Sequence, residues 1–297
     1  MKFLVDIPGY SKLSGGIQRM LELNEILQEY GESELHLPND IYPESFDYII
    51  TYSDNPRINE LCSIAEYRKA KVIVYQLSYG MCLERERKVV DHPDTIVCCS
   101  TRHIQKKIIA DTLSNKNTHY IGHSQEHTTE NFFPEDAFHE YDVAIMIHKA
   151  PDKQFLKAFS YCKAQGMRII LFGGRNNNFS FEGAERVFLN ADVSRMRWIF
   201  SNAKKYLSLS TTEGLNRPGV EAMLCGCKPY IIDGCEIYKD GKNCKKIKKV
   251  EEILDNFEIM EYNAIKDELK EYTWDKVMTR LGEVLNVEFE KSTKSNV

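Results

Sequence analysis

Two glutamates in the segment TTEGLNRPGVEAM (residues 211–223) have the type and spacing of a ligand-binding pair. Glu213 precedes Pro218 and Glu221 follows it, with seven residues between the two glutamates. Each carboxylate can accept hydrogen bonds from two hydroxyl groups. The pair therefore predicts a ligand that carries hydroxyl groups on both sides of its centre.

The residues between the glutamates are predicted to lead from a strand into a helix. Residues 205–210 (KYLSLS) form an apolar run of strand length, and a proline suits the first turn of a helix over 218–225. Near such a helix start, backbone amides lack acceptors within the helix and favour an anionic group such as phosphate. The amides expected there belong to Leu215, Asn216 and Arg217.

Buried strands and helices that could position this segment alternate along the first part of the chain. Predicted strands lie at 2–7, 34–38, 46–52, 71–77, 94–100 and 119–122, and predicted helices at 17–30, 57–69 and 102–113. The apolar runs are continuous rather than alternating, which is typical of parallel strands covered by helices on both faces.

The same alternation restarts after a polar, acidic stretch at 123–140. Predicted strands follow at 141–147, 167–174, 205–210 and 228–233, with helices at 152–165, near 194–203 and at 218–225. We therefore predict an α/β fold of two successive domains. Their expected ranges are 1–122, a linker at 123–140, a second domain at 141–271, and a C-terminal helix and tail at 272–297.

Composition narrows the class of protein. Hydrophobic residues make up 42% of the chain and charged residues 28%, and the formal net charge is -5, so there is no global basic field of a general nucleic-acid binder. No apolar run approaches the roughly 20 residues that span a bilayer, and the N-terminus does not resemble a signal peptide. These features predict a cytoplasmic protein without a transmembrane segment.

Three further features of the sequence contain residue types that occur in binding sites. Cys225, Cys227, Cys235 and Cys244 lie close in sequence but lack the two-residue gap of a zinc-binding pair. His119, His123 and His127 recur every four residues, but Gly122 argues against a shared helix face. Neither set predicts a metal site. The basic run 241–249 is either a solvated face or a contact for an anionic acceptor, including DNA.

The segment EGLNRPGVEAMLCGCKP (213–229) resembles the retaining glycosyltransferases of family 4. Their hallmark is a Glu, seven residues and a second Glu, with glycine and proline between them and "EAM…G…P" after. Further resemblance lies in segments 15–27, 145–159, 170–174, 235–244 and 272–277. The similarity covers most of the chain, strongly in 141–280 and weakly in 32–140.

This resemblance implies the GT-B fold: two Rossmann-like domains facing across a cleft that holds a nucleotide-diphosphate-sugar donor. By position, Glu221 would hold the ribose hydroxyls and Glu213 would contact the donor sugar. Lys153 would neutralise the diphosphate leaving group, and His148 occupies the usual place of an arginine.

Glycines complete the implied donor site. Gly15 and Gly16 would let the backbone of the first domain approach the diphosphate, and Gly174 ends a strand that resembles the family's glycine-terminated strand. The resemblance implies no metal and no cofactor besides the donor substrate, because a lysine and amide dipoles stabilise the departing charge.

The sequence departs from the family pattern at several positions. Asn216 and Arg217 replace small residues, and Arg217 either adds a charge to the site or is solvated. Many family members carry a histidine after the strand that matches 71–77, where this chain has Gln76 and Ser78. No acceptor-side catalytic residue is therefore predicted.

The predicted function is a retaining, metal-independent glycosyltransferase that moves a sugar from a nucleotide-diphosphate sugar to an acceptor hydroxyl of a saccharide or small molecule. Three alternatives stay open. They are a phage-type DNA glycosyltransferase acting on a modified base, a nucleotide-sugar epimerase that also hydrolyses its substrate, and a nucleotide-sugar-binding protein with reduced catalysis.

Overall fold

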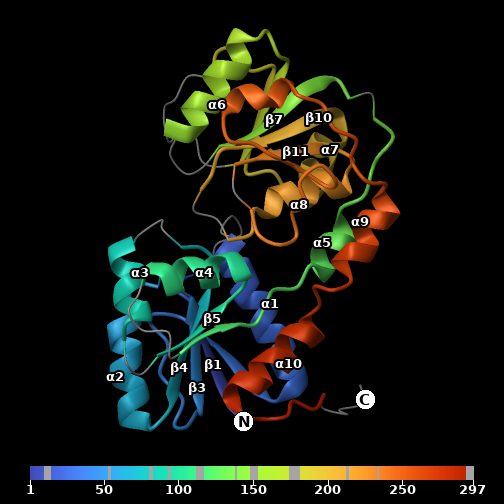
Figure 1. Cartoon of the computed structure of the whole chain (residues 1–297). Helices are drawn as coiled ribbons and strands as arrows, with labels where there is room; N and C mark the ends of the chain where they lie inside the picture. The colour runs from blue at the N-terminus through green and yellow to red at the C-terminus, as the bar shows by residue number, and fades with distance from the viewer. Residues whose placement is uncertain are drawn as a thin grey trace. The chain divides into compact units, whose positions relative to one another are not determined.

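The computed structural model describes residues 1–9, 15–52, 55–79, 83–92, 95–111, 117–137, 139–147, 153–173, 181–211, 214–232 and 234–291. The chain forms two compact units (Figure 1). Unit 1 comprises Met1–Ser124 and Thr273–Val297, and unit 2 comprises Gln125–Tyr272. No helix in the described part of the chain combines the length and the apolar character needed to cross a membrane.

Unit 1 contains a six-stranded parallel sheet in the order β2-β1-β3-β4-β5-β6. The strands are β1 (Lys2–Asp6), β2 (Glu32–His36), β3 (Tyr48–Tyr52), β4 (Lys71–Gln76), β5 (Thr95–Cys99) and β6 (Thr118–Tyr120). The strand order changes direction at β1, so the carboxyl ends of β1 and β3 form a topological switch point, where ligands of open α/β sheets bind.

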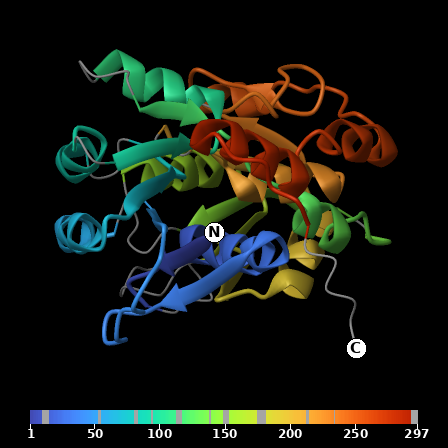
Figure 2. The same cartoon turned by 90° about the horizontal axis from the view of Figure 1, so that it is seen from below.

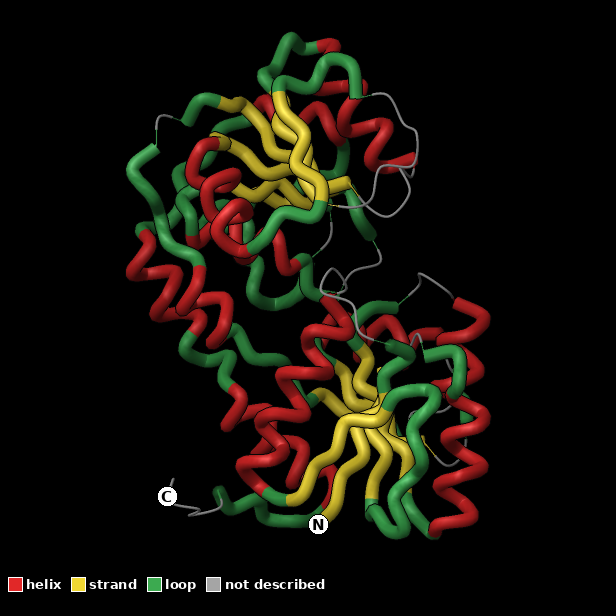
Figure 3. Tube along the Cα trace, turned by 180° about the vertical axis from the view of Figure 1, so that it is seen from behind, coloured by secondary structure: helices red, strands yellow, loops and turns green. Residues whose placement is uncertain are grey.

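Helices cover both faces of this sheet (Figures 2 and 3). On one face, α1 (Gly15–Tyr30) and α10 (Trp274–Leu285) pack on a core that includes Phe3 and Val5 of β1. On the other face, α2 (Ile58–Arg68) and α3 (Leu83–Val90) pack against residues that include Leu4, while α4 (Arg102–Asp111) covers β5. Successive residues of β1 thus point to opposite faces, as the pleat requires.

The last helix of the chain belongs to unit 1 because its apolar stripe completes the core beside α1. Trp274, Val277, Met278 and Leu281 are all buried in the same cluster as the apolar face of α1. Trp274 also lies under the guanidinium of Arg19, 5.6 Å from the ring centroid. The Tyr30 hydroxyl donates a hydrogen bond to Asp275, at 2.7 Å. The chain therefore returns to its first unit after finishing the second.

Unit 2 contains a second six-stranded parallel sheet, in the order β12-β11-β10-β7-β8-β9. The strands are β7 (Tyr141–Ile147), β8 (Ile169–Gly173), β9 (Arg186–Leu189), β10 (Ala203–Ser208), β11 (Lys228–Ile231) and β12 (Lys245–Lys246). The strand order reverses between β7 and β10. The carboxyl ends of these two strands therefore form the switch point of unit 2.

The two faces of the second sheet are covered by different helices. One face carries α6 (Lys153–Ala164) and the 3₁₀ helix η1 (Val250–Leu254). The opposite face carries α7 (Val193–Asn202), α8 (Arg217–Leu224) and α9 (Tyr262–Leu269). Tyr206 of β10 points into the second group and its neighbour Leu207 into the first.

The structure differs from the sequence prediction in the segment 123–140, where no regular element was expected. It contains a short helix, α5 (Glu126–Asn131), and Phe132 after it is buried in the core of unit 2. Phe132 and hydrogen bonds from Arg197 to Glu135 and to the Asn131 carbonyl oxygen anchor this polar segment. The helix α3 and the edge strands β9 and β12 were also not predicted, because their own residues are mostly polar or the strands are very short.

Candidate active site

The helix α8 begins where the loop after β10 meets the core of unit 2. Asn216 is its N-cap residue, and its side-chain Oδ1 accepts a hydrogen bond from the Gly219 amide, at 3.1 Å. Pro218 occupies the first turn, where a missing amide proton costs nothing. The predicted strand-to-helix transition is thus present, one residue earlier than expected.

Asn216 also ties the start of α8 to the end of β10. The Tyr206 hydroxyl donates to Asn216 Oδ1 at 3.0 Å, and Asn216 Nδ2 donates to Ser208 Oγ at 2.7 Å. The Tyr238 hydroxyl donates to the carbonyl oxygen of Asn216. The side chain that departs from the family's small residue is therefore a buried structural clamp at the carboxyl end of the sheet.

We expect Asn216→Ala to lower the free energy of unfolding by about 2 to 4 kcal/mol, because it removes a helix cap and its hydrogen bonds with two buried hydroxyl groups. Asn216→Asp keeps the acceptor for Gly219 and Tyr206 and should cost less. Urea unfolding of both variants measures the difference. A loss below about 0.5 kcal/mol for the alanine variant would contradict this role.

Glu221 lies one turn into α8 and is paired there with Arg217. Glu221 is only 7% exposed, and its Oε1 accepts a hydrogen bond from Arg217 Nε at 3.1 Å. A second guanidinium nitrogen of Arg217 lies 3.3 Å from His127 Nδ1, on α5. Burial raises the pKa of Glu221, and the charge and hydrogen bond of Arg217 oppose that rise. Arg217 is thus paired with Glu221 rather than fully solvated, and its contribution of charge to a donor site stays a prediction.

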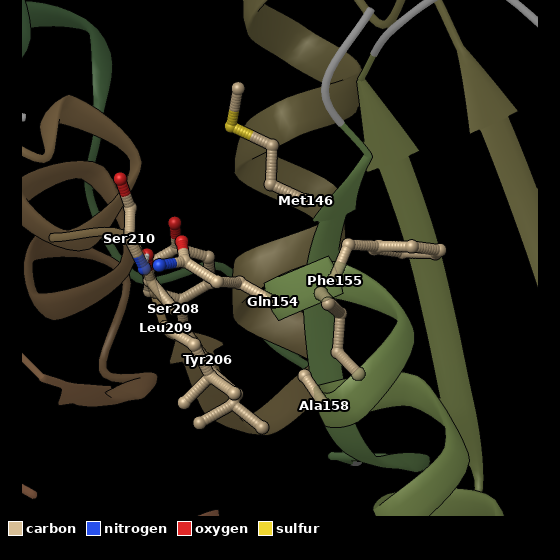
Figure 4. Close-up of a pocket in the computed structure, with 10 residues that line it drawn as sticks. Met146, Gln154, Phe155, Ala158, Tyr206, Ser208, Leu209 and Ser210 are labelled. Atoms are coloured by element: carbon tan, nitrogen blue, oxygen red, sulfur yellow. Dashed lines mark hydrogen bonds between the residues drawn. The ribbon is translucent and has the colours of Figure 1, made fainter. Parts of the chain in front are cut away.

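A pocket lies between the carboxyl ends of β7 and β10 and the first turn of α6 (Figure 4). Its lining residues are Ile145, Met146, Gln154, Phe155, Ala158, Tyr206, Leu207, Ser208, Leu209 and Ser210. Figure 4 shows the Gln154 amide extending from α6 toward Ser208 and Ser210. Two of the lining residues, Tyr206 and Ser208, also form hydrogen bonds with Asn216, the N-cap residue of α8. A polar end and an apolar wall meet at the switch point of the sheet.

Unit 1 carries a buried polar cluster at the carboxyl ends of its own central strands. Asp6, at the end of β1, is fully buried. Its Oδ2 lies 2.8 Å from His36 Nδ1 and 3.3 Å from an Arg57 nitrogen, and its Oδ1 accepts from Asn55 Nδ2 at 2.6 Å. Burial raises the pKa of Asp6, while hydrogen bonds from His36 and Asn55 lower it. This cluster joins the strand ends on both sides of the switch point.

Solved structures with the same arrangement of elements are glycosyltransferases and a related synthase. The lipopolysaccharide outer core galactosyltransferase WaaB matches 96% of this chain and 99% of its own, with a TM-score of 0.68 and 10% identity. Sucrose-phosphate synthase from Thermosynechococcus elongatus matches 96% and 98%, with a TM-score of 0.65 and 11% identity. HepE from Anabaena, in complex with UDP and glucose, matches 96% and 95%, with a TM-score of 0.65 and 11% identity. The chain has the GT-B fold.

The expected class of two Rossmann-like α/β domains of the GT-B type is therefore confirmed. No protein-family model and no curated protein sequence matches the chain. At 10 to 11% identity the structural likeness shows the fold and leaves the reaction to be argued from the site.

Several residues predicted for the GT-B donor site lie outside the described part of the chain. These are Glu213, His148 and Gly174, and for Lys153 only the backbone is described, as the first residue of α6. Their roles stay predictions. Gly15 and Gly16 are the first two residues of α1, in unit 1, so they belong to a helix start rather than to the loop before it.

The amides at the start of α8 differ from each other. The Arg217 amide donates to the carbonyl oxygen of Leu215 at 2.9 Å, so the prediction that it is unpaired is wrong. For the amides of Leu215 and Asn216 the described residues provide no acceptor. Two of the three expected amides thus remain suited to an anion.

The sequence prediction missed the polar end of the pocket and the contact with His127. Ser208 and Ser210 alternate at the end of an apolar strand, and Gln154 directly follows Lys153, so their positions were a usable signal. His127 came close to Arg217 only through the packing of α5 on α8.

Within the described residues, no group of three or more His, Cys, Asp or Glu side chains is placed to hold a metal ion. Cys225, Cys227, Cys235 and Cys244, the set weighed for zinc, are free thiols buried in one apolar cluster of unit 2. Burial raises the pKa of the Cys235 and Cys244 thiols to about 12, so they pack as small apolar groups.

Proposed function

We propose that this protein is a retaining glycosyltransferase, similar to family 4, that moves a sugar from a nucleotide-diphosphate sugar to an acceptor hydroxyl. The observation that carries the proposal is the buried Glu221 carboxylate in the first turns of α8, the helix that follows β10 at the switch point of unit 2. A carboxylate in this position suits a ribose diol, and the helix start suits the adjoining phosphates.

In the proposed reaction the bond between the anomeric carbon and the phosphate oxygen breaks. The nucleoside diphosphate leaves with the bonding electrons, and the acceptor oxygen bonds to the same face of the sugar. The proton of the acceptor hydroxyl passes to the leaving phosphate. Lys153 and the amides of Leu215 and Asn216 stabilise the charge on the leaving group, and Glu213 orients the donor sugar.

A carbohydrate or small molecule is the acceptor that the charges favour over DNA. One lysine of the basic run 241–249, Lys245, and one just before it, Lys239, lie near carboxylates. Lys239 lies 2.8 Å from Glu268, and Lys245 lies 4.0 Å from Asp255. Such pairing reduces the positive field that a DNA backbone requires.

The test is a thermal-unfolding screen of uridine, guanosine, adenosine and thymidine diphosphate sugars, since a bound ligand raises the melting temperature by mass action. We expect one donor to stabilise the wild type and to be hydrolysed slowly without acceptor, with the α-anomer kept and with EDTA having no effect. The retention is read by NMR of the released sugar. A donor that binds without any turnover would favour the binding-protein alternative, and inversion would remove the likeness to family 4.

We expect Lys153→Ala to lower the rate of donor hydrolysis by about 100-fold or more, because an electrostatic contact to the departing charge is lost. Lys157→Ala, one turn further along the exposed side of α6, is the matched control and should keep the wild-type rate. Equal rates for both variants would remove Lys153 from the proposed site.

A further inference from the structure

Arg217 occupies a position that does not serve helix stability. It is the first residue of α8, where the helix dipole disfavours a cation. Its ion pair with Glu221 runs in the less favourable order, with the base four residues before the acid. The pair is nevertheless formed and mostly buried, with side chains 22% and 9% exposed. A function other than stabilising α8 would explain why the cation lies there.

The guanidinium is held from two elements. Nε donates to Glu221 Oε1 within α8, at 3.1 Å, and another nitrogen lies 3.3 Å from His127 Nδ1 on α5. Because α5 packs on α8, the planar group has one orientation relative to the carboxylate. The position of the Glu221 carboxylate is fixed in turn.

The Glu221 carboxylate keeps hydrogen-bond acceptor capacity while it is paired with Arg217. A carboxylate has about four acceptor positions. Arg217 is the one hydrogen-bond donor to Glu221 among the described residues, and it contacts only Oε1. The salt bridge therefore leaves enough acceptor positions on the carboxylate for two hydroxyl groups.

We infer that Arg217 is a positioning residue, which aims the buried Glu221 carboxylate at the ribose hydroxyls of the donor and keeps it negatively charged. The inference rests on the proposed function and adds to it a residue that touches no substrate. It also explains how an acidic group so deeply buried can serve as a hydrogen-bond acceptor.

The electrostatics of the site agree with this role. Burial has the largest effect on the pKa of Glu221 and raises it. The positive charge of Arg217 and its hydrogen bond to Glu221 both lower this pKa. Without Arg217 the pKa of Glu221 would rise further, so the carboxylate would lose its charge at a higher pH. Nucleotide binding weakens at low pH as this carboxylate becomes protonated, and we call this part of the pH profile the acidic limb. In a variant without Arg217 the acidic limb should therefore lie at a higher pH.

Other titratable groups nearby do not change the direction of this expected shift in the pKa of Glu221. The buried Cys225 thiol on α8 has a raised pKa and is uncharged near neutral pH. Beyond it, Arg197 of α7 and Glu135 neutralise each other at 2.6 Å. His127 faces Arg217 rather than the carboxylate.

The experiment measures binding of UDP, GDP, ADP and TDP by calorimetry from about pH 5 to about pH 9. Wild type is compared with Arg217→Ala, Arg217→Lys and Lys239→Ala, which removes an equal charge from another ion pair of unit 2. We expect the acidic limb to move up by about 1 to 3 pH units in Arg217→Ala and by less in Arg217→Lys. Lys239→Ala should bind as the wild type does.

The outcomes separate this inference from the proposed function. A wild type that binds none of the four diphosphates would overturn both. A wild type that binds one, together with an unchanged affinity and pH profile in Arg217→Ala, would overturn the inference alone. If Arg217→Ala does not fold, the pH profile of nucleotide binding in Arg217→Lys decides. An acidic limb at the wild-type pH in that variant would contradict the proposed role of the guanidinium.

Discussion

Replacing Glu221 by alanine should weaken binding of the nucleoside diphosphate by about 100-fold to about 1,000-fold. The buried carboxylate is expected to accept hydrogen bonds from two ribose hydroxyls, and hydrogen bonds to a charged group contribute about 1.5 to 3 kcal/mol each. The enclosed setting of the side chain, at 7% exposure, leaves little water to replace those bonds. Calorimetry with the diphosphate that binds the wild type measures the loss.

Two variants make this result specific. Glu221→Gln keeps the shape and one acceptor oxygen, so it should lose less affinity than the alanine variant. Glu268→Ala removes a carboxylate of α9 that pairs with Lys239 in the same unit, and this variant should bind like the wild type. Wild-type affinity in Glu221→Ala, with thermal unfolding unchanged, would show that this carboxylate does not contact the nucleotide.

Replacing Asp6 by alanine should lower the free energy of unfolding of unit 1 by about 3 to 5 kcal/mol. The change removes the shared acceptor of His36, Asn55 and Arg57 and leaves buried donors without it. Because the Arg57 guanidinium is cationic, the cost exceeds that of one neutral hydrogen bond.

The chain offers a direct probe of this unit. It has two tryptophans, of which Trp274 packs in unit 1 and Trp198 in unit 2. In a Trp198→Phe background, tryptophan fluorescence during urea unfolding follows unit 1. Glu32→Ala, which breaks an exposed pair with Lys2, is the control and should cost less than about 1 kcal/mol. An Asp6→Ala loss as small as that of the control would show that the cluster does not hold the strand ends.

The buried polar cluster around Asp6 shows why part of the structure could not be predicted. Asp6 follows a buried apolar run, which is a local signal for a strand end. Its partners His36, Asn55 and Arg57 lie 30, 49 and 51 residues away, and nothing local indicates that they converge. The parallel pairing of β1 with β2 and β3 brings them together.

The same reason applies to Arg217 and to the last helix. The spacing of Arg217 and Glu221 allows a contact on one helix face, but a solvated arginine has the same sequence. The ion pair between Arg217 and Glu221 forms because α8 is buried against α5, α7 and α9. The apolar stripe of α10 likewise required a partner, and the sequence did not say that the partner lies in unit 1.

By itself, the sequence determined the alternation of buried parallel strands and covering helices, and hence two α/β domains with a strand-to-helix turn between the two glutamates. It could do so because hydrophobic period, helix caps and turn residues are local properties. Tertiary structure alone decided which strand ends meet at each switch point, where α10 docks and which partner Arg217 takes. Those outcomes depend on contacts between residues that are distant in the chain. A local sequence pattern does not determine the energies of such contacts.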